Sequence, residues 1–464
     1  MNFIGLHNHT DIDSNLRLKD SIVKVKDLIT ESAKLGYKGI AFTGHDGCQS
    51  HIKAIKTTRD LKSKGLIPRD FKTILGVELY LIDRNNAIEK REKNERIDFY
   101  HLILLAKDEK GHEALRYLSS EAWEHSFHYK GLERIPVYKD YFKTIINKYK
   151  GSLICSTACL GGELAKLSEA YFDNPTEENK RKIHVFICEM LELFGEDFYI
   201  EIQPSFNEMQ VRFNKFALML SDAYRIKTII TTDTHYLRKE YQIFHHYFLQ
   251  SKESSERETS EFYSTTHLMS EEEMYEYVKD YISKEKLNDI FNNTIEIGNK
   301  VLEYDLNQDI RIPEATIPYF ELKHLFALYY DKYEYIKKYS QSNHNSDLYF
   351  LSLLEEGFLN KGLEFNDINL GRLNEELKTF WIISENLKQE LSGYLLLTRE
   401  IIHDILWKVS YVGVSRGSAS GSLCNYLLDI VQLNPLEHNL PFYRFISVDR
   451  PEFPDRIESL CLAS

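Results

Sequence analysis

The 464-residue sequence lacks several features that would assign it to particular classes of protein. Its six cysteines are scattered, with no Cys-x-x-Cys pair and no regular framework, which fits a reducing, cytoplasmic setting. No apolar run is long enough to cross a bilayer, so we expect no membrane partner. The first residues, MNFIGLHNH, lack the basic and apolar regions of a signal peptide.

Positive charge is also scarce. The formal net charge is −13, whereas a protein that holds a nucleic-acid backbone usually shows a basic footprint. Composition alone therefore gives no reason to expect DNA binding. Hydrophobic residues make up 43% and charged residues 28%, which predicts a globular chain long enough for two or three domains.

Residues 1 to about 240 alternate short β-branched runs with amphipathic helical stretches. One such stretch, with Val25, Leu28 and Leu35 on one side, is expected to end at Gly36. Repeated β-then-α units predict a parallel sheet, and about seven of them predict a TIM-like β/α barrel. The expected strands are 2–6, 39–43, 74–80, 100–105, 153–156, 198–202 and 228–231.

The remainder of the chain has a different pattern. Residues 250–260 are polar and predict an exposed loop, and a helical stretch follows from 270 to about 301. Two prolines in residues 312–318 predict a linker between domains. Residues 320–410 are helix-rich, and from Gly413 a Gly/Ser-rich loop leads into an apolar helix expected over 423–431.

Metal-ligand residue types recur where the barrel strands end. His7 and His9 are two apart in an extended segment, so both imidazoles can reach one ion, although such a pair alone is more often incidental. In a parallel barrel the carboxyl ends of the strands surround one mouth. The other ligand-type residues at or near expected strands are His45, Glu78, His101, Cys159, Asp233 and His235.

Each of these residues also has an ordinary structural interpretation. Cys159 can be a buried small hydrophobe, and Glu78 can satisfy a buried arginine or backbone group. Asp20 suits the N-cap of a helix starting near Ser21 as well as it suits a ligand role. Asp11 and Asp13 are further carboxylates in the same loop. The histidines in helical patterns are expected to be structural or solvated, namely His51, His112, His245 and His246.

The convergence at one mouth favours a multinuclear metal site. A set of imidazoles, carboxylates and one thiol suits Zn²⁺, Mn²⁺ or Fe²⁺, and this many ligands predict two or three ions. Such a cluster can activate water and clamp the attacking and leaving oxygens. The expected reaction is hydrolysis of a phosphomonoester or phosphodiester, with no catalytic residue identified beyond the metal-activated water.

A second candidate site is the loop from Gly413 to Ser422. Successive amides before a helix favour an anionic phosphate, and Arg416 adds a bidentate donor. As a bare Gly/Ser loop the signal is weak, and it matches neither a Walker loop nor a dinucleotide fingerprint.

Several motifs resemble a known family. The segments LHNHT, TGHDG, GVELY, YHLILLAKDEKG, STACLGGE, DFYIEIQP and TTDTHYL occur in the order of the PHP (polymerase and histidinol phosphatase) domain. They are most similar to the version that opens the alpha subunit of bacterial DNA polymerase III, a C-family polymerase. EFYSTTHLMSEEEM and the segment from VSRGSASGSLCNYLLDIVQLNP to DRPEFPD extend the resemblance over nearly the whole chain.

The resemblance implies a PHP-type barrel with up to three metals and a 3′–5′ proofreading exonuclease activity. It implies a PHP domain over 1–300, linker and connecting helices over 301–345, and a partial, helix-rich polymerase palm/thumb region over 346–464. One departure is that the family has an aspartate before the motif-two histidine, where this chain has Gly44. The implied ligands are His7, His9, Asp20, His45, Glu78, His101, Cys159, Asp233 and His235.

In the family, the Gly/Ser loop holds the triphosphate of the incoming deoxynucleotide, which implies this role for Arg416, Gly417, Ser418 and Ser422. A Pro-Asp-x-Asp-x-Asp segment that binds two Mg²⁺ normally follows. Here only Asp455 matches its carboxylates, so we expect no DNA synthesis by this chain alone. Mg²⁺-dependent synthesis would need a complete palm, and the ending predicts a truncated, split or intein-interrupted polymerase.

Three functions remain open at this point. The leading one is an N-terminal polymerase portion that acts on single-stranded DNA or a primer terminus, with deoxynucleotides, other replication proteins or a complementing polymerase fragment as further partners. The second is a stand-alone PHP phosphatase, similar to histidinol phosphatase, that acts on a small phosphomonoester. The third is a non-catalytic module that binds DNA or replication proteins.

Overall fold

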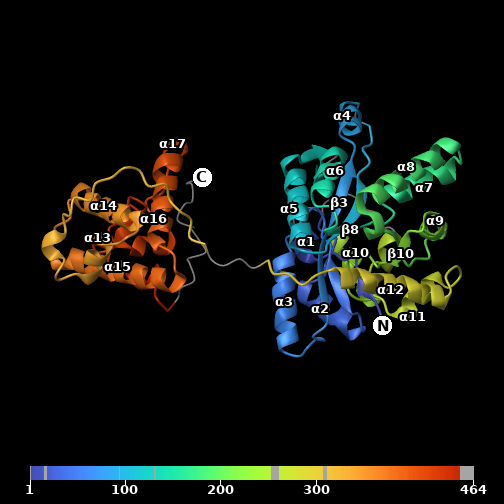
Figure 1. Ribbon diagram of the computed structural model, residues 1–464, viewed down its shortest axis with the longest axis horizontal. Helices are drawn as coiled ribbons and strands as arrows, with labels where there is room; N and C mark the ends of the chain where they lie inside the picture. The colour runs from blue at the N-terminus through green and yellow to red at the C-terminus, as the bar shows by residue number, and fades with distance from the viewer. Residues whose placement is uncertain are drawn as a thin grey trace. The chain divides into compact units, whose positions relative to one another are not determined.

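The computed structural model describes residues 2–14, 18–93, 95–129, 132–251, 261–306 and 311–449. The chain divides into two compact units, residues 1–307 and 308–464, each with its own hydrophobic core (Figure 1). None of the helices in the described residues is long and apolar enough to cross a membrane.

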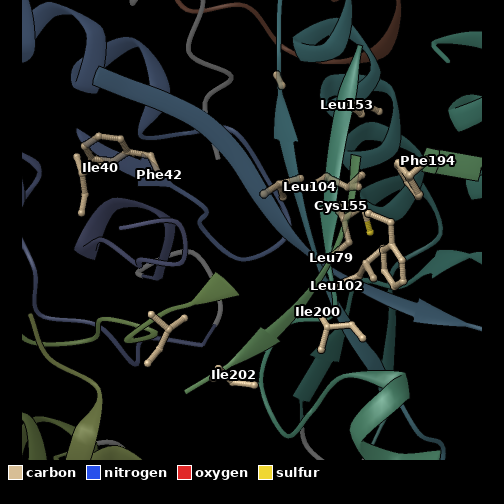
Figure 2. Close-up of a cluster of buried hydrophobic side chains, with 14 of the residues drawn as sticks. Ile40, Phe42, Leu79, Leu102, Leu104, Leu153, Cys155, Phe194, Ile200 and Ile202 are labelled. Carbon is tan, nitrogen blue, oxygen red and sulfur yellow. The ribbon is translucent and has the colours of Figure 1, made fainter. Parts of the chain in front are cut away.

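Unit 1 is built on a curled sheet whose strands have two apolar faces. Along β4, Leu102 and Leu104 face the surrounding helices while Ile103 and Leu105 face inward. Figure 2 shows the helix-facing side, where Leu79, Leu102 and Leu104 gather with side chains of the neighbouring strands. The main strands are β1 (Ile4–Gly5), β2 (Gly39–Phe42), β3 (Lys72–Ile82), β4 (Tyr100–Ala106), β8 (Leu153–Ser156), β9 (Phe198–Ile202) and β10 (Lys227–Ile230).

The strand order is β1-β2-β3-β4-β8-β9-β10, and β7 (Val137–Tyr138) pairs with the end of β3. The PHP-type fold predicted for this part is confirmed, but the all-parallel sheet is wrong. Strand β4 runs antiparallel to both β3 and β8. Alternating apolar residues predict a strand without specifying its direction, so the reversal was not visible in the pattern.

The two outer strands meet at one end of the sheet. Beyond β1 and β10 the chain forms a parallel bridge between Asn8 and Thr234. The amide of His9 donates to the Thr234 carbonyl at 3.0 Å, and the Thr234 amide donates to the His7 carbonyl at 3.2 Å. These hydrogen bonds bring the segments after the first and last strands together.

Helices cover the outer face of the sheet. Helix α2 ends as predicted, because Gly36 follows its last turn with φ at +83°. The expected helix over 270–301 is two helices, and the expected loop over 250–260 lies largely outside the described residues. The helices of unit 1 are α1 (Asp11–Ser14), α2 (Val25–Lys34), α3 (His51–Ser63), α4 (Arg84–Glu92), α5 (Glu109–Glu124), α6 (Lys139–Lys148), α7 (Glu163–Asp173), α8 (Glu177–Phe194), α9 (Glu208–Tyr224), α10 (Gln242–Gln250), α11 (Glu271–Val278) and α12 (Lys284–Lys300), beside a small hairpin of β5 (Phe127–Tyr129) and β6 (Leu132–Arg134).

Unit 2 is helical over its described residues. Its main helices are α13 (Glu334–Ser340), α14 (Asn345–Asn360), α15 (Asp367–Leu387), α16 (Leu391–Glu400), α17 (Trp407–Val409) and α18 (Leu423–Leu427). Helix α18 is shorter than expected and ends before Asp429, which has a left-handed φ of +59°. Ile312, Ala315 and Ile317, in the segment where prolines predict a linker, pack against the core of unit 2.

Candidate metal centre

The predicted ligand residues come together at the end of the sheet where β1 and β10 meet. His7 and His9 follow β1, and Asp233 and His235 follow β10, so the Asn8–Thr234 bridge places the two pairs side by side. In each pair the residues are two apart in extended chain and point to the same side. All four side chains are buried.

The first group of ligand atoms is a small triangle. The Nε2 atoms of His7 and His9 lie 3.1 Å apart, and Asp233 Oδ1 is 3.2 Å and 3.0 Å from them, respectively. Ligand atoms bound at about 2.0–2.2 Å to one ion lie about 3.0–3.5 Å from one another. The three side chains therefore have the spacing of ligands to a single ion.

Glu78 lies at the centre of the site. One of its carboxylate oxygens is 2.7 Å from His101 Nδ1, and the other is 2.7 Å from His45 Nδ1. The second oxygen is also 3.5 Å from His9 Nε2. The Cys159 sulfur, 3.4 Å from His101 Nδ1, completes a second candidate group of Glu78, His101 and Cys159.

The third group contains His9, His45 and His235, whose ligand atoms lie within 4.8 Å of one another. Asp20 is at its edge, with Oδ2 at 3.2 Å from His45 Nε2 and 4.0 Å from His235 Nε2. Its other oxygen accepts from the Ser14 hydroxyl. The N-cap interpretation of Asp20 is wrong, because the N-cap of α2 is Lys24.

The donor set fits divalent cations. Among the described residues, the ion pairs of Asp20, Glu78 and Asp233 are all with histidines. His45 Nε2, Glu78 Oε2 and Asp233 Oδ1 are buried, and the polar atoms given near them belong to other side chains of the same site. Buried carboxylates that lack a full complement of partners are costly unless a cation compensates them. Imidazoles with carboxylates and a thiol are the ligands of zinc-like and iron-like ions.

Protonation divides the histidines into two kinds. Burial alone would lower the pKa of His7, but Asp233 and Glu201 outweigh it and raise the pKa to about 10. The pKa of His45 is raised in the same way by Asp20 and Glu78 against burial. Burial and the neighbouring His9 lower the pKa of His235 to about 4. Without a cation, His7 and His45 thus hold protons that a metal would displace.

Glu201 is a functional residue that the sequence analysis missed. It is buried on β9, and its Oε1 accepts from His7 Nδ1 at 2.7 Å and from the Thr231 hydroxyl at 2.6 Å. The Ser156 hydroxyl donates to its other oxygen at 2.6 Å. This is the arrangement of a carboxylate that would fix the ring of a metal-binding histidine. The sequence feature that could have identified Glu201 is an acidic residue in an apolar strand, between Ile200 and Ile202, which face the helices.

Gly44, where the family pattern has an aspartate, lies against another carboxylate. A Cβ atom on Gly44 would lie 2.1 Å from Asp13 Cγ and 2.5 Å from Asp13 Oδ2. Asp13 is held there by the Thr10 hydroxyl at 2.7 Å and the Ser50 amide at 3.0 Å. A carboxylate therefore fills the space next to His45, but it comes from position 13.

The Gly/Ser loop of unit 2 has two parts. Arg416, Gly417 and Ser418 are exposed, and Gly417 has φ at +65°. Ser422 is buried, and its hydroxyl donates to Glu376 at 2.8 Å. The amides of Leu423 and Cys424 also donate to Glu376, at 2.7 Å and 2.9 Å. An internal carboxylate thus occupies the amide cluster at the start of α18, and Asp455 lies outside the described residues.

Comparison with known proteins agrees with this geometry. Residues 5–205 match the PHP domain family, and residues 339–456 match the bacterial DNA polymerase III alpha NTPase domain. The DNA-directed DNA polymerase of Bacillus phage SPbeta is 42% identical over 472 residues, which cover 97% of this chain and 36% of the phage protein. The DNA polymerase III alpha subunit of Campylobacter jejuni is 30% identical over 474 residues, covering 99% of this chain and 36% of that protein. That of Borreliella burgdorferi is 28% identical over 461 residues, covering 98% and 34%.

The fold and the site define a PHP-type phosphoesterase domain with candidate metal-binding groups. The chain as a whole belongs to the DNA polymerase III alpha-like proteins and corresponds to their N-terminal part. It spans about a third of the length of the curated relatives that it matches.

Proposed function

We propose that unit 1 is a metal-dependent 3′–5′ exonuclease that removes nucleotides from single-stranded DNA or a frayed primer terminus. Water is added across the terminal phosphodiester, releasing a nucleoside monophosphate and a strand with a new 3′ hydroxyl. The observation that carries this proposal is the convergence of three ligand groups around Glu78, with buried carboxylates whose ion-pair partners among the described residues are all histidines. Two or three ions of the Zn²⁺, Mn²⁺ or Fe²⁺ class would activate water and clamp the phosphate oxygens.

Each residue group has its own task in this proposal. His7, His9 and Asp233 hold one ion, and Glu78, His101 and Cys159 hold a second. His45 and His235, with Asp20, would hold a third, since His9 can serve only one of the two groups to which it is close. Glu201 orients His7 through Nδ1, so that Nε2 faces the site. His101, whose side chain is 25% exposed, marks the side from which the substrate enters.

A cavity of about 800 Å³ lies beside Lys139 on that side. Two contacts place Lys139 near His101. Lys139 lies over the ring of Tyr100, the residue before His101. It also pairs with Glu163, the residue after Gly162, and Gly162 forms a β-bridge with His101. The cavity is also lined by Lys143, Arg181 and Lys182, and by the carboxylates of Asp83, Asp140, Glu163, Glu178 and Glu189. Phosphates of the strand behind its 3′ end would contact these lysines only in exchange for the pairs of Lys139, Lys143 and Lys182 with Glu163, Glu189 and Glu178.

We further propose that Arg416, Gly417 and Ser418 contact the triphosphate of a deoxynucleotide when the rest of a polymerase is present. Their exposure supports this role, while Ser422 would act by fixing the loop on Glu376. DNA synthesis would then be an activity of the longer protein, with Mg²⁺ bound by a complete palm. Other replication proteins would be its partners, as expected for a DNA polymerase III alpha-like protein.

The test is metal content together with cleavage of a 3′-labelled single-stranded oligonucleotide. Wild type would be compared with His9→Ala and Asp233→Ala, and with His184→Ala as a matched control on the exposed side of α8. We expect Mn²⁺- or Zn²⁺-dependent cleavage that is lost in the two site variants and kept in the control.

Three results would contradict the proposal. Two or three bound ions without cleavage would make the site structural, and the absence of bound metal would remove its basis. Hydrolysis of histidinol phosphate without cleavage of DNA would instead favour the small-molecule phosphatase.

A further inference from the structure

A second cluster of metal-ligand side chains lies outside the site described above. Cys48 in the loop after β2, His51 at the start of α3 and His112 in α5 place their ligand atoms within 4.8 Å of one another. His51 and His112 are 1% and 4% exposed, and Cys48 is partly buried against the main core. The cluster lies among α3, α5 and β3, on the helix side of the sheet.

The hydrogen bonds of His51 define which of its nitrogens is available. His51 Nε2 is 2.9 Å from the Gly76 carbonyl oxygen, which can only accept, so Nε2 carries the hydrogen. The lone pair of His51 is therefore on Nδ1, which is 2.9 Å from His112 Nε2. With its Nε2 hydrogen on a backbone carbonyl, His51 has Nδ1 left either to accept from His112 Nε2 or to bind an ion, and the second state is the arrangement of a metal-binding histidine.

Two further polar atoms at the cluster are buried without a hydrogen-bond partner. They are Nδ1 of His112 and the hydroxyl of Tyr304, whose ring lies 6.2 Å from that of His112. The two facing imidazole nitrogens have the same close spacing as the Nε2 atoms of His7 and His9 in the main site, 2.9 Å against 3.1 Å. A hydrogen bond within the histidine pair also accounts for this distance, so the metal content has to be measured to separate the two states.

We propose that Cys48, His51 and His112 form a separate site for a single Zn²⁺-like ion, with water in the fourth position. One thiolate and two imidazoles are a ligand set for a tetrahedral zinc site, and the partial exposure of Cys48 leaves a route for water. The ion would fasten the loop after β2, which also carries His45, to helix α5. Binding of this ion does not depend on the exonuclease activity.

The first experiment measures zinc per chain in the full-length protein by mass spectrometry of the metal. Cys48→Ser should lower the zinc content by one equivalent, and Cys188→Ser, at an exposed cysteine, should not change it. His9→Ala should lower the content through the main site and leave the Cys48-dependent equivalent in place. In the Co²⁺-loaded protein, Cys48→Ser should remove a thiolate-to-cobalt absorption band that persists in Cys159→Ser.

A second experiment needs no variant and covers the case in which Cys48→Ser does not fold. Wild-type protein is treated with an alkylating agent, and modification of each cysteine is followed by peptide mass spectrometry. Zinc should slow the modification of Cys48 at least about tenfold, and a chelator should abolish this protection, while Cys188 reacts equally in both states. Equal zinc content in wild type and Cys48→Ser, or no protection of Cys48 by zinc, would overturn the proposal.

Discussion

Two buried carboxylates in this chain have opposite surroundings. Glu376 in unit 2 is fully buried, and it accepts from Arg372 Nε at 2.7 Å, from two backbone amides and from the Ser422 hydroxyl. Glu78 in unit 1 is 1% exposed and has only histidines as ion-pair partners among the described residues.

The difference separates a carboxylate that is satisfied within its own unit from a candidate metal ligand. Burial of a charge is costly, and Glu376 meets that cost with an arginine and donors from its own unit. At Glu78 the compensation is incomplete without protons on the histidines or cations from solution. The feature that identifies the metal site is thus the missing complement of donors rather than the burial itself.

The largest effect is expected when Glu78 is replaced by glutamine. The amide keeps the shape but cannot bridge cations, so cleavage of single-stranded DNA should fall more than about 100-fold, beyond what loss of a supporting residue costs. Cleavage assays and metal content measure this. Unchanged cleavage would make Glu78 a structural residue of the same kind as Glu376.

The same substitution at Glu376 should act on stability alone. Glu376→Gln leaves Arg372 without its carboxylate and presents an NH₂ group to backbone amides, which should cost about 3–5 kcal/mol. Unfolding of unit 2 can be followed by the fluorescence of Trp381 and Trp407 in a Trp123→Phe background. The metal content of unit 1 should remain that of wild type. If Glu376→Gln lowered the free energy of unfolding by less than Glu78→Gln does, the comparison would be contradicted.

Glu201 provides an intermediate case, because it is buried and hydrogen-bonded but supports a ligand. Glu201→Gln should weaken metal binding about 10- to 100-fold, since His7 Nδ1 loses its carboxylate partner. Metal titration in competition with a chromophoric chelator measures the affinity. Glu163→Gln, which removes a surface pair with Lys139, serves as the control. Equal affinities in the two variants would contradict the role given to Glu201.

The exchange of a carboxylate between positions 44 and 13 can be tested directly. Gly44→Asp would force atoms into contact with Asp13 and should destabilise unit 1 by about 1–3 kcal/mol. Asp13→Gly in the same chain should restore stability and metal content by vacating that space. Thermal unfolding and metal analysis compare the three proteins, and a neutral Gly44→Asp single variant would show that the two positions do not exclude each other.

The smallest effect concerns pH. The pKa of His7 is raised to about 10 in the metal-free protein, so its contribution to stability is complete below the unfolded value near 6.5 and is lost as pH rises toward 10. Metal binding displaces the same proton and becomes more favourable over that range. The increase in Tm caused by metal should therefore grow from pH 6.5 to 9. A constant increment would show that His7 does not release a proton on binding.

The grouping of the candidate ligands at one end of the sheet could be predicted from strand ends, yet the expected place of His101 rested on an incorrect strand direction. His101 was placed at the mouth as if β4 were parallel, whereas it lies near the first residue of a reversed strand. The reversal leaves the amino end of β4 at the same mouth as the carboxyl ends of its neighbours. Glu201 was overlooked because an acidic residue in an apolar run has no distinctive spacing of its own.

The sequence by itself determined the positions of the main strands, because alternating apolar side chains must be buried on two faces wherever the strand lies. It also determined which side chains are able to hold a metal. Only the tertiary structure decided the direction of β4 and placed the Asp13 carboxylate beside Gly44. It also decided that the amides at the start of α18 donate hydrogen bonds to Glu376. These depend on residues that are distant along the chain and meet only after the elements have packed, so no local pattern records them.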